Sequence, residues 1–247
     1  PDAIGAYTNP TAEYFNGLID EVRVYNRALS AAEVQTLYKT GAQKILAPAN
    51  LGLVGYWSFN DATSTNTTFP TRAGDFSGNG NTGILTNGPV WANGRLGKAL
   101  SFDGSNDYVN LGTNKIGPLL NGASSISLAA WFYARDSDAG RMHSIIIATV
   151  VTGAAITVTS GLRVGGRSVS TDAFQSKTIT FPSLNRWHHV VGILNITGDT
   201  IEIYVDGVSQ GSSAVTFGNT TYTQGTPTTE PDAIGAYTNP TAEYFNG

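Results

Sequence analysis

Apolar and polar residues alternate in short runs along most of the chain, and this pattern predicts β-strands. The run Ile201–Val205 (IEIYV) is typical, because its apolar side chains would all point to one face of a sheet. Turn sequences such as Thr197–Asp199 and Asp206–Gly207 separate the runs. The predicted strands are Leu18–Tyr25, Leu53–Phe59, Gly83–Leu85, Ala99–Phe102, Tyr108–Leu111, Ile126–Ala134, Ser144–Val151, Ala155–Thr159, Leu162–Val164, Thr178–Phe181, His188–Ile196, Thr200–Val205, Ala214–Phe217 and Ala233–Tyr237.

One segment has helical periodicity instead. Ser30 is a suitable N-cap, and Glu33, three residues later, completes a capping box. Val34 and Leu37 fall on one face, and Gly41 can end the helix. The sequence therefore predicts an all-β fold with one short helix packed on its surface.

The chain carries a long exact repeat. Residues 1–17 and 231–247 both read PDAIGAYTNPTAEYFNG, identical at 17 positions and offset by 230 residues. The repeat indicates a recent duplication or one subunit sequence written across its own join. A period of this length is a whole domain, unlike the short units of solenoids. On this interpretation residues 1–45 are the end of one copy, and residues 46–247 are the opening and central part of the next. The joint Ile45–Asn50 contains a proline, as inter-domain joints often do.

Composition narrows the class of protein. Charged residues make up 13% of the chain, about half the usual share, while 40% are hydrophobic. This balance is common in secreted β-proteins with neutral polar surfaces. The net charge of −4 without a basic run argues against nucleic-acid binding, and no apolar run approaches the length needed for membrane insertion. The lack of cysteine favours a prokaryotic source, and the lack of an initiator Met and signal peptide indicates a piece of a longer protein.

Several segments resemble motifs of one family. Residues 15–30, FNGLIDEVRVYNRALS, are similar to the closing signature of bacterial laminin-G-like modules. Residues 52–60 (GLVGYWSFN) resemble their opening strand, and residues 75–83 (DFSGNGNTG) resemble a loop of the same modules. Further segments match in order at residues 97–104, 126–132, 187–191 and 203–207. The closing signature comes first here, so the order is permuted.

This resemblance to laminin-G-like, concanavalin A-like modules carries several expectations. It implies a two-sheet antiparallel jelly-roll sandwich with one short helix of the C-terminal type. It also implies a non-catalytic module that binds glycans or protein partners and often holds a calcium ion.

The loop that begins at residue 75 is the leading candidate for a metal site. Asp75, Ser77, Asn79 and Asn81 place oxygen-bearing side chains at alternate positions, and calcium takes six to eight oxygen ligands. The loop lacks the bidentate glutamate of an EF-hand, and the family resemblance points to Asp20, or its equivalent in the next copy, as the completing carboxylate. The predicted ligands are therefore Asp75, Asn79, Asn81 and Asp20. The alternative is an Asx-rich turn that satisfies its own backbone.

Other polar motifs favour structural roles. His188 and His189 are adjacent, so they point to opposite faces of a strand and cannot share a zinc ion. Asp103–Gly104 and Asp206–Gly207 favour turns over ligands.

Aromatic residues divide into two groups. The four tryptophans lie in apolar runs and are expected mostly in the core, whereas four tyrosines in polar surroundings are better candidates for glycan contact. The tryptophans are Trp57, Trp91, Trp131 and Trp187, and the tyrosines are Tyr7, Tyr14, Tyr222 and Tyr237.

The motifs of common hydrolases are absent from the sequence. There is no Glu-x-x-x-Glu pair, no Gly-x-Ser-x-Gly elbow and no cysteine. We therefore expect a protein that is not an enzyme, namely an extracellular module that forms a tandem array or filament of a cell-surface adhesion protein, with neighbouring copies as head-to-tail partners. The alternative is a carbohydrate-binding module that targets a polysaccharide.

Two arrangements of residues 1–45 are open at this point. The segment can fold back and close the sandwich within the chain, or it can complete the preceding domain while the next segment completes this one. We favour the second, which is a head-to-tail contact that generates an array. In either case Ile19, Val22 and Val24 need a partner, because they would otherwise expose an apolar sheet edge.

Overall fold

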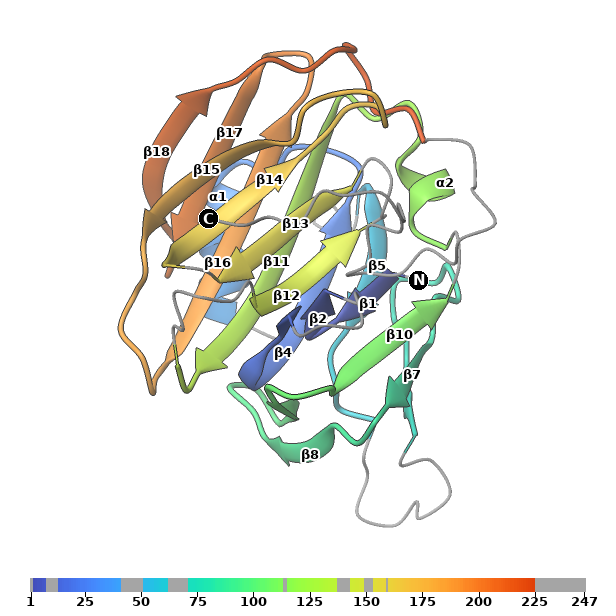
Figure 1. The fold of residues 1–247 in the computed structure, drawn as a ribbon, viewed down its shortest axis with the longest axis vertical. Coiled ribbons are helices and arrows are strands. Elements are labelled where there is room, and N and C mark those ends of the chain that lie inside the picture. Colours follow the sequence, from blue (N-terminus) through green and yellow to red (C-terminus); the bar gives the residue numbers. More distant parts are fainter. Residues whose placement is uncertain are drawn as a thin grey trace, which may run out of the picture.

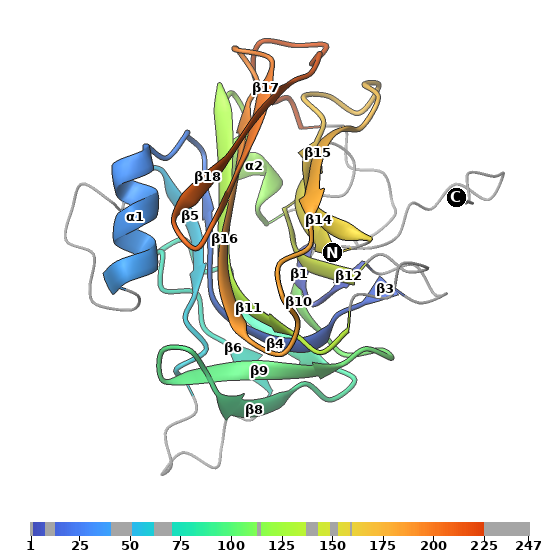
Figure 2. The ribbon, with the colours of Figure 1, turned by 90° about the vertical axis from the view of Figure 1, so that its left-hand side faces the viewer.

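Two antiparallel sheets pack face to face, and one helix lies outside them (Figures 1 and 2). The computed structural model describes residues 2–7, 13–40, 51–61, 71–112, 115–136, 143–148, 153–158 and 160–224. This architecture confirms the predicted all-β, two-sheet jelly-roll sandwich.

The first sheet has eight strands, and one of its inner strands has only three residues. Their order is β15 (Gln175–Thr180), β14 (Gly161–Gly166), β13 (Ala154–Val158), β12 (His143–Ala148), β1 (Asp2–Ile4), β10 (Tyr108–Gly112), β7 (Gly83–Thr86) and β6 (Arg72–Ala73).

The second sheet is built around a ten-residue strand, β4. Its order is β18 (Val208–Ala214), β17 (Thr200–Val205), β16 (Trp187–Asn195), β11 (Ser125–Ala134), β4 (Asn16–Tyr25), β9 (Lys98–Asp103) and β8 (Val90–Asn93), and β5 (Leu53–Trp57) also pairs with β4. The remaining elements are β2 (Ala6–Tyr7), β3 (Glu13–Tyr14), α1 (Ala31–Thr40) and α2 (Gly117–Leu120).

The core lies between the sheets because each strand turns its apolar side chains inward. On β4 the core residues Ile19 and Val22 are three positions apart, which a regular strand would place on opposite faces. Glu21 has a positive φ of 54°, and the pairing with β11 shifts register here. This bulge returns both side chains to the core face.

Helix α1 covers the outer face of the second sheet (Figure 2). Its buried residues Val34 and Leu37 pack in one cluster with Ala129, Val191 and Ile193 of the strands below. The predicted helix is thus confirmed, and it has a single apolar face because the opposite side meets solvent. None of the helices in the described part of the chain is long and apolar enough to cross a membrane.

The N-terminal segment is part of the same sandwich as the rest of the chain. β1 pairs with β10 on one side and with β12 on the other, while β4 pairs with β11, β5 and β9. The structure of this chain therefore has the first of the two arrangements, closure within the chain. The division at residues 45/46 and the head-to-tail arrangement concern a longer array, and both stay predictions.

Some elements differ from the sequence prediction. The strand predicted at Ala214–Phe217 is wrong: β18 spans Val208–Ala214, and Phe217 is a buried loop residue. The edge strand β18 is mostly exposed and polar, so it lacks the alternation that marks a half-buried strand. β8 and α2 were not predicted. The predicted strand Ala233–Tyr237 lies outside the described residues, although the same sequence at residues 3–7 forms β1 and β2.

We expect Ile19→Ala on β4 to lower the free energy of unfolding by about 2–5 kcal/mol, because it leaves a cavity at a fully buried position. Ile84→Ala is the control, since Ile84 is 54% exposed and its truncation should change stability by less than about 0.5 kcal/mol. Urea unfolding followed by tryptophan fluorescence measures both. Equal losses in the two variants would contradict the central place of β4.

Candidate functional site

The loop proposed as a metal site is fastened to β5 through the carboxylate of Asp75. The backbone N–H groups of Tyr56 and Ser77 donate to Asp75 Oδ1 at 3.0 and 2.8 Å. The N–H of Asn81 donates to Oδ2 at 2.8 Å, and the Ser77 hydroxyl lies 2.9 Å from the same atom. The loop thus folds around its own carboxylate, which is the geometry of an Asx-rich turn.

The two asparagines of the loop also face β5. The side-chain amides of Asn79 and Asn81 donate to the carbonyl of Val54 at 2.9 and 3.1 Å, and the Trp57 indole donates to the carbonyl of Asn81 at 2.9 Å. The structure therefore brings three of the four predicted metal ligands together, as a latch that holds the loop on β5.

These residues do not fit a calcium ion in this arrangement. A carboxylate has about four acceptor sites, and three N–H groups and a hydroxyl already approach those of Asp75. The fourth predicted ligand, Asp20, instead accepts a hydrogen bond from the backbone of Leu96. Among the described residues no three His, Asp or Glu side chains gather as a metal site. Calcium stays a prediction of the sequence that this geometry does not support.

A buried charged cluster lies at the bulge of β4. Arg23 donates to Glu21 Oε2 at 2.6 Å, and the Tyr56 hydroxyl donates to the same oxygen at 2.8 Å. The Arg23 guanidinium also stacks 4.1 Å above the Tyr56 ring. Arg23 is 3% exposed, and Asp20 and Glu21 are 0% exposed. This cluster was not predicted, although the charges between Ile19, Val22 and Val24 were a signal for it.

Burial controls the protonation of this cluster. It raises the pKa of Asp20 to about 8, and the neighbouring Glu21 adds to the shift, while the hydrogen bond from Leu96 opposes it. Burial also raises the pKa of Glu21, although Arg23 and Tyr56 oppose that shift. Asp20 lies opposite Trp131 of β11, and Trp131 lies opposite His189 of β16. Burial lowers the pKa of His189 to about 3, so this imidazole is neutral.

Polar atoms of the same region have no hydrogen-bond partner within the described residues. They are Asp20 Oδ1, Glu21 Oε1, Trp131 Nε1 and both ring nitrogens of His189. Trp131 is covered by a stacked Tyr38 at 5.5 Å and by the Arg95 guanidinium at 4.9 Å. Tyr38 also lies 6.2 Å from the His189 ring, so an aromatic and cationic layer covers Trp131 and an aromatic ring lies beside His189.

A second set of residues has the composition of a nucleophile triad. His188 Nδ1 lies 2.8 Å from Asp206 Oδ2, and His188 Nε2 lies 3.2 Å from the Ser183 hydroxyl. The Ser183 carbonyl oxygen is closer to Nε2, at 3.0 Å. The carbonyl therefore competes with the hydroxyl for the same ring nitrogen. His188 thus ties the loop of Ser183 to the turn of Asp206.

The two Asp–Gly motifs are turns, as predicted. Asp206 and Gly207 both have positive φ, 51° and 78°, and they join β17 to β18 as a two-residue hairpin loop. Asp103 accepts hydrogen bonds from the backbone of Ser105 and Asn106. Neither carboxylate is arranged as a metal ligand.

The tryptophans divide unevenly between core and surface. Trp57 is 0% exposed and Trp131 is 3% exposed, as expected for core residues, whereas Trp91 and Trp187 are half-buried. Of the tyrosines favoured for glycan contact, Tyr222 is buried and 1% exposed, so that prediction is wrong for it. Tyr14 is half-buried, and nothing is described of the side chains of Tyr7 and Tyr237.

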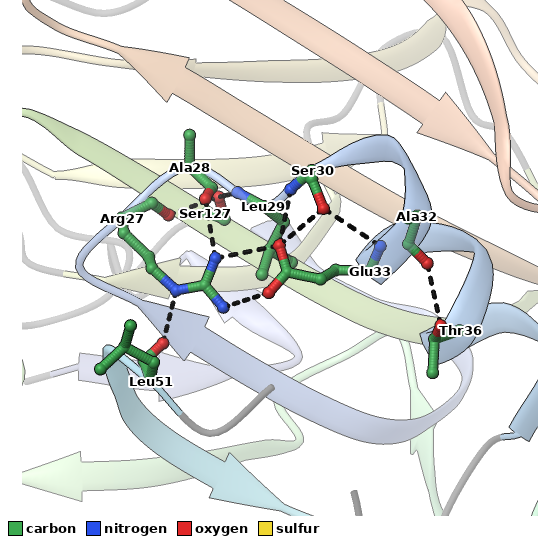
Figure 3. Close-up of polar contacts among 9 residues, drawn as sticks. All are labelled: Arg27, Ala28, Leu29, Ser30, Ala32, Glu33, Thr36, Leu51 and Ser127. Atoms are coloured by element: carbon green, nitrogen blue, oxygen red, sulfur yellow. Dashed lines mark hydrogen bonds and ion pairs between the residues drawn. The ribbon is translucent and has the colours of Figure 1, made fainter. Parts of the chain in front are cut away.

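The polar residues at the start of α1 fasten the helix to the sheet (Figure 3). The Ser30 N–H donates to Glu33 Oε2 at 2.8 Å and the Glu33 N–H donates to Ser30 Oγ at 3.3 Å, which confirms the capping box. Arg27 pairs with Glu33, which lowers the pKa of Glu33 to about 2, and donates to the Leu51 carbonyl at 2.6 Å. The Ser127 hydroxyl of β11 donates to the Arg27 carbonyl at 2.7 Å. The corner after β4 is thereby fixed to both β11 and the entry of β5.

Fold and site together define a jelly-roll module whose polar clusters hold strands, loops and helix in place. The family model described as the concanavalin A-like lectin/glucanases superfamily (Laminin_G_3) matches residues 1–35 and 103–247, and the chain belongs to this superfamily. No curated protein matches the chain. Among solved structures, it is similar to residues 221–444 of an S-layer domain-containing protein from Clostridium thermocellum, with 21% identity over 69% of this chain and 73% of that chain and a TM-score of 0.38.

We expect Asp75→Asn to destabilise the protein by about 1–3 kcal/mol, because the amide nitrogen would face backbone N–H groups that need an acceptor. Thermal unfolding measures the loss. In the same assay 5 mM calcium chloride, compared with magnesium chloride, should leave the wild-type midpoint unchanged. A rise specific to calcium would contradict the latch interpretation and support the metal site predicted from the sequence.

The stability of the wild-type protein should fall as the pH rises from 6.5 to 8. A carboxyl with a higher pKa in the folded than in the unfolded chain holds its proton more tightly when folded, so Asp20 disfavours folding increasingly from about pH 4 to its folded value. His189 acts in the opposite direction, but only from about pH 3 to 6.5, where the unfolded chain binds the proton. Above pH 6.5 His189 no longer opposes Asp20. Asp20 then lowers the free energy of unfolding by about 2 kcal/mol between pH 6.5 and 8.

Asp20→Asn should reduce this fall, because asparagine keeps an acceptor for the Leu96 amide and carries no proton to lose. Urea unfolding at pH 6.5, 7.2 and 8 measures the slope. Asp103→Asn, on an exposed turn, is the control and should keep the wild-type slope. Parallel slopes for wild type and Asp20→Asn would show that Asp20 is ionised in the folded protein.

Proposed function

We propose that this chain is a non-catalytic module of an extracellular repeat protein, in which neighbouring copies follow one another head to tail. The observation that carries the proposal is the 17-residue identity between residues 1–17 and 231–247. A period of 230 residues is the size of one whole sandwich of this superfamily. A chain that repeats at this interval is a row of identical modules, and each module presents the same surface to a binding partner.

The structure of the N-terminal segment supports a linear array. Residues 13–40 contribute a central strand and a helix to the sandwich, and they precede the rest of the domain in the chain. In an array this segment lies between two domains and belongs by sequence to the copy before it. Adjacent modules are then linked through their cores, which suits a structural or adhesive role.

The carboxyl groups support a non-catalytic role. Asp20 has the raised pKa of a general acid, but it is 0% exposed, as is its neighbour Glu21. A glycosidase needs two carboxyl groups that reach both sides of a sugar bond. Two fully buried carboxyl groups have no such access.

An extracellular, bacterial location is part of the proposal. The chain has no cysteine and few charged residues, and glycine, threonine and asparagine are plentiful in its sequence. This composition is typical of large bacterial surface proteins.

A second candidate function is carbohydrate binding, which the superfamily membership favours. Trp187 is half-buried and makes an edge contact with Tyr133, with the ring centroids 5.9 Å apart. The two rings form an aromatic pair on the outer face of the second sheet that can present a ring to a sugar. On this alternative each module would deliver its parent protein to a polysaccharide.

A protein of two full periods, in which residues 18–247 follow residue 247, tests the array. We expect two unfolding events of equal size in single-molecule force spectroscopy, each releasing roughly 80 nm of chain, because each 230-residue period folds as one unit. The present chain, with one period, should give a single event.

Two other results would count against the array. One merged event of double length would mean that the periods do not fold as separate units. Saturable binding of the one-period chain to a glycan array, lost in Trp187→Ala, would make carbohydrate binding the leading function.

A further inference from the structure

The strand β1 occupies a position without which the first sheet is not continuous. Residues Ala3 and Ile4 pair with β10 on one side and with β12 on the other. Both side chains are 0% exposed. We call this position between β10 and β12 the strand seat. An empty seat would leave two open sheet edges and an apolar gap, so an occupant is required.

The strand seat is selective for its sequence. A side chain at Gly5 would place its Cβ 2.4 Å from the Phe102 ring, and Gly5 has a φ of 89°. The Gly5 carbonyl accepts a hydrogen bond from the N–H of Phe15, whose ring packs on Phe102 with centroids 6.5 Å apart. The seat therefore requires an Ile-Gly pair followed ten residues later by a phenylalanine.

The chain contains a second segment that meets this requirement. Ala233, Ile234, Gly235 and Phe245 stand at the same places in residues 231–247 as Ala3, Ile4, Gly5 and Phe15 do in residues 1–17. Each contact made by the first copy can be made by the second. One seat thus has two identical candidates in one chain.

The last described residues before the second copy lie near α2. The Tyr222 N–H donates to the carbonyl of Ala123, and the Gln224 N–H donates to Asn121, both directly after α2. β1 begins at the same end of the sandwich, since Asp2 pairs with Gly112 shortly before α2.

The direction of β1 and the length of residues 225–231 are also compatible with entry of the second copy into the seat. β1 runs away from the α2 end, because Asp2 lies opposite Gly112 and Ile4 lies opposite Val109. A chain arriving from Gln224 would enter the seat in the same direction. Residues 225–231 can span about 25 Å when extended, which is the scale of a small domain.

We propose that the strand seat is exchangeable, and that residues 231–245 of the same chain occupy it when residues 1–15 leave, while Asn16–Tyr25 stay in place as β4. The inference rests on the repeat that carries the proposed function and deepens it: each module can be closed from either side. The occupants are chemically identical, so the exchange keeps every contact of the seat and changes only which end of the chain is released.

Four full-length proteins test the exchange: wild type, Ile4→Asp, Ile234→Asp and the double variant. An aspartate in the buried seat is strongly disfavoured, so a chain with one intact copy should use that copy. We expect Ile234→Asp to leave the thermal midpoint unchanged and Ile4→Asp to lower it by less than about 3 °C. The double variant should lose more than about 8 °C, since no intact copy remains.

Other patterns overturn the proposal. If Ile4→Asp falls as far as the double variant, the second copy does not replace the first. If all four midpoints agree, the seat does not select its occupant. Light scattering after gel filtration distinguishes the source: Ile4→Asp should stay monomeric, and a dimer that grows with concentration would mean that the copy comes from a second chain.

These outcomes are separate from those of the two-period protein. The exchange is measured in a chain with one period, so it can fail while equal modules still unfold one by one. It can also hold where no array forms.

Discussion

Both sheets of this sandwich depend on one short stretch near the start of the chain. β4 pairs with β11 on one side and with β5 and β9 on the other, and β1 joins β10 to β12. Without β1 the first sheet would divide into β15–β12 and β10–β6, and without β4 the second would lose its centre. Because inter-strand hydrogen bonds and the core between the sheets form together, residues 2–25 act as the closing element of the whole fold.

This dependence explains the charged cluster beside the core. A central strand has neighbours on both sides and a helix-covered outer face, so its polar side chains have no path to water. The Glu21 carboxylate instead forms an ion pair with Arg23 and accepts a hydrogen bond from the Tyr56 hydroxyl. Asp20 accepts a hydrogen bond from Leu96, and burial raises its pKa to about 8, so the carboxyl is neutral under most conditions. Burying such groups adds little stability.

The sequence predicted the elements in which apolar residues alternate and left out those in which they do not. Strands such as Ile126–Ala134 and the helix capped by Ser30 carry their own signals, so their positions were predictable. β18 lies at an edge with exposed polar residues, and it forms because β17 offers a partner, which is a tertiary effect.

The candidate site was predicted less well than the fold, for a related reason. The oxygen-rich spacing of Asp75, Asn79 and Asn81 is the same for a cation site and for a turn that binds its own backbone. Only the position of β5 decides between them, since Tyr56 and Val54 supply the hydrogen-bond partners. Those partners come from a strand some twenty residues earlier in the chain. Local spacing cannot reveal them.

The repeat gives the closing element a choice that a single domain does not have. In an array each closing segment lies between two cores, joined to one through residues 225–230 and to the other through residues 41–50. The contacts are the same on either side, so the two closures differ mainly in loop entropy. Linkers of six and ten residues differ by only about 0.5 kcal/mol in this respect. Once one core takes the segment on its left, the core before it has lost the segment on its right and must also take the one on its left. A preference at one end of the array therefore sets the direction of closure along its whole length.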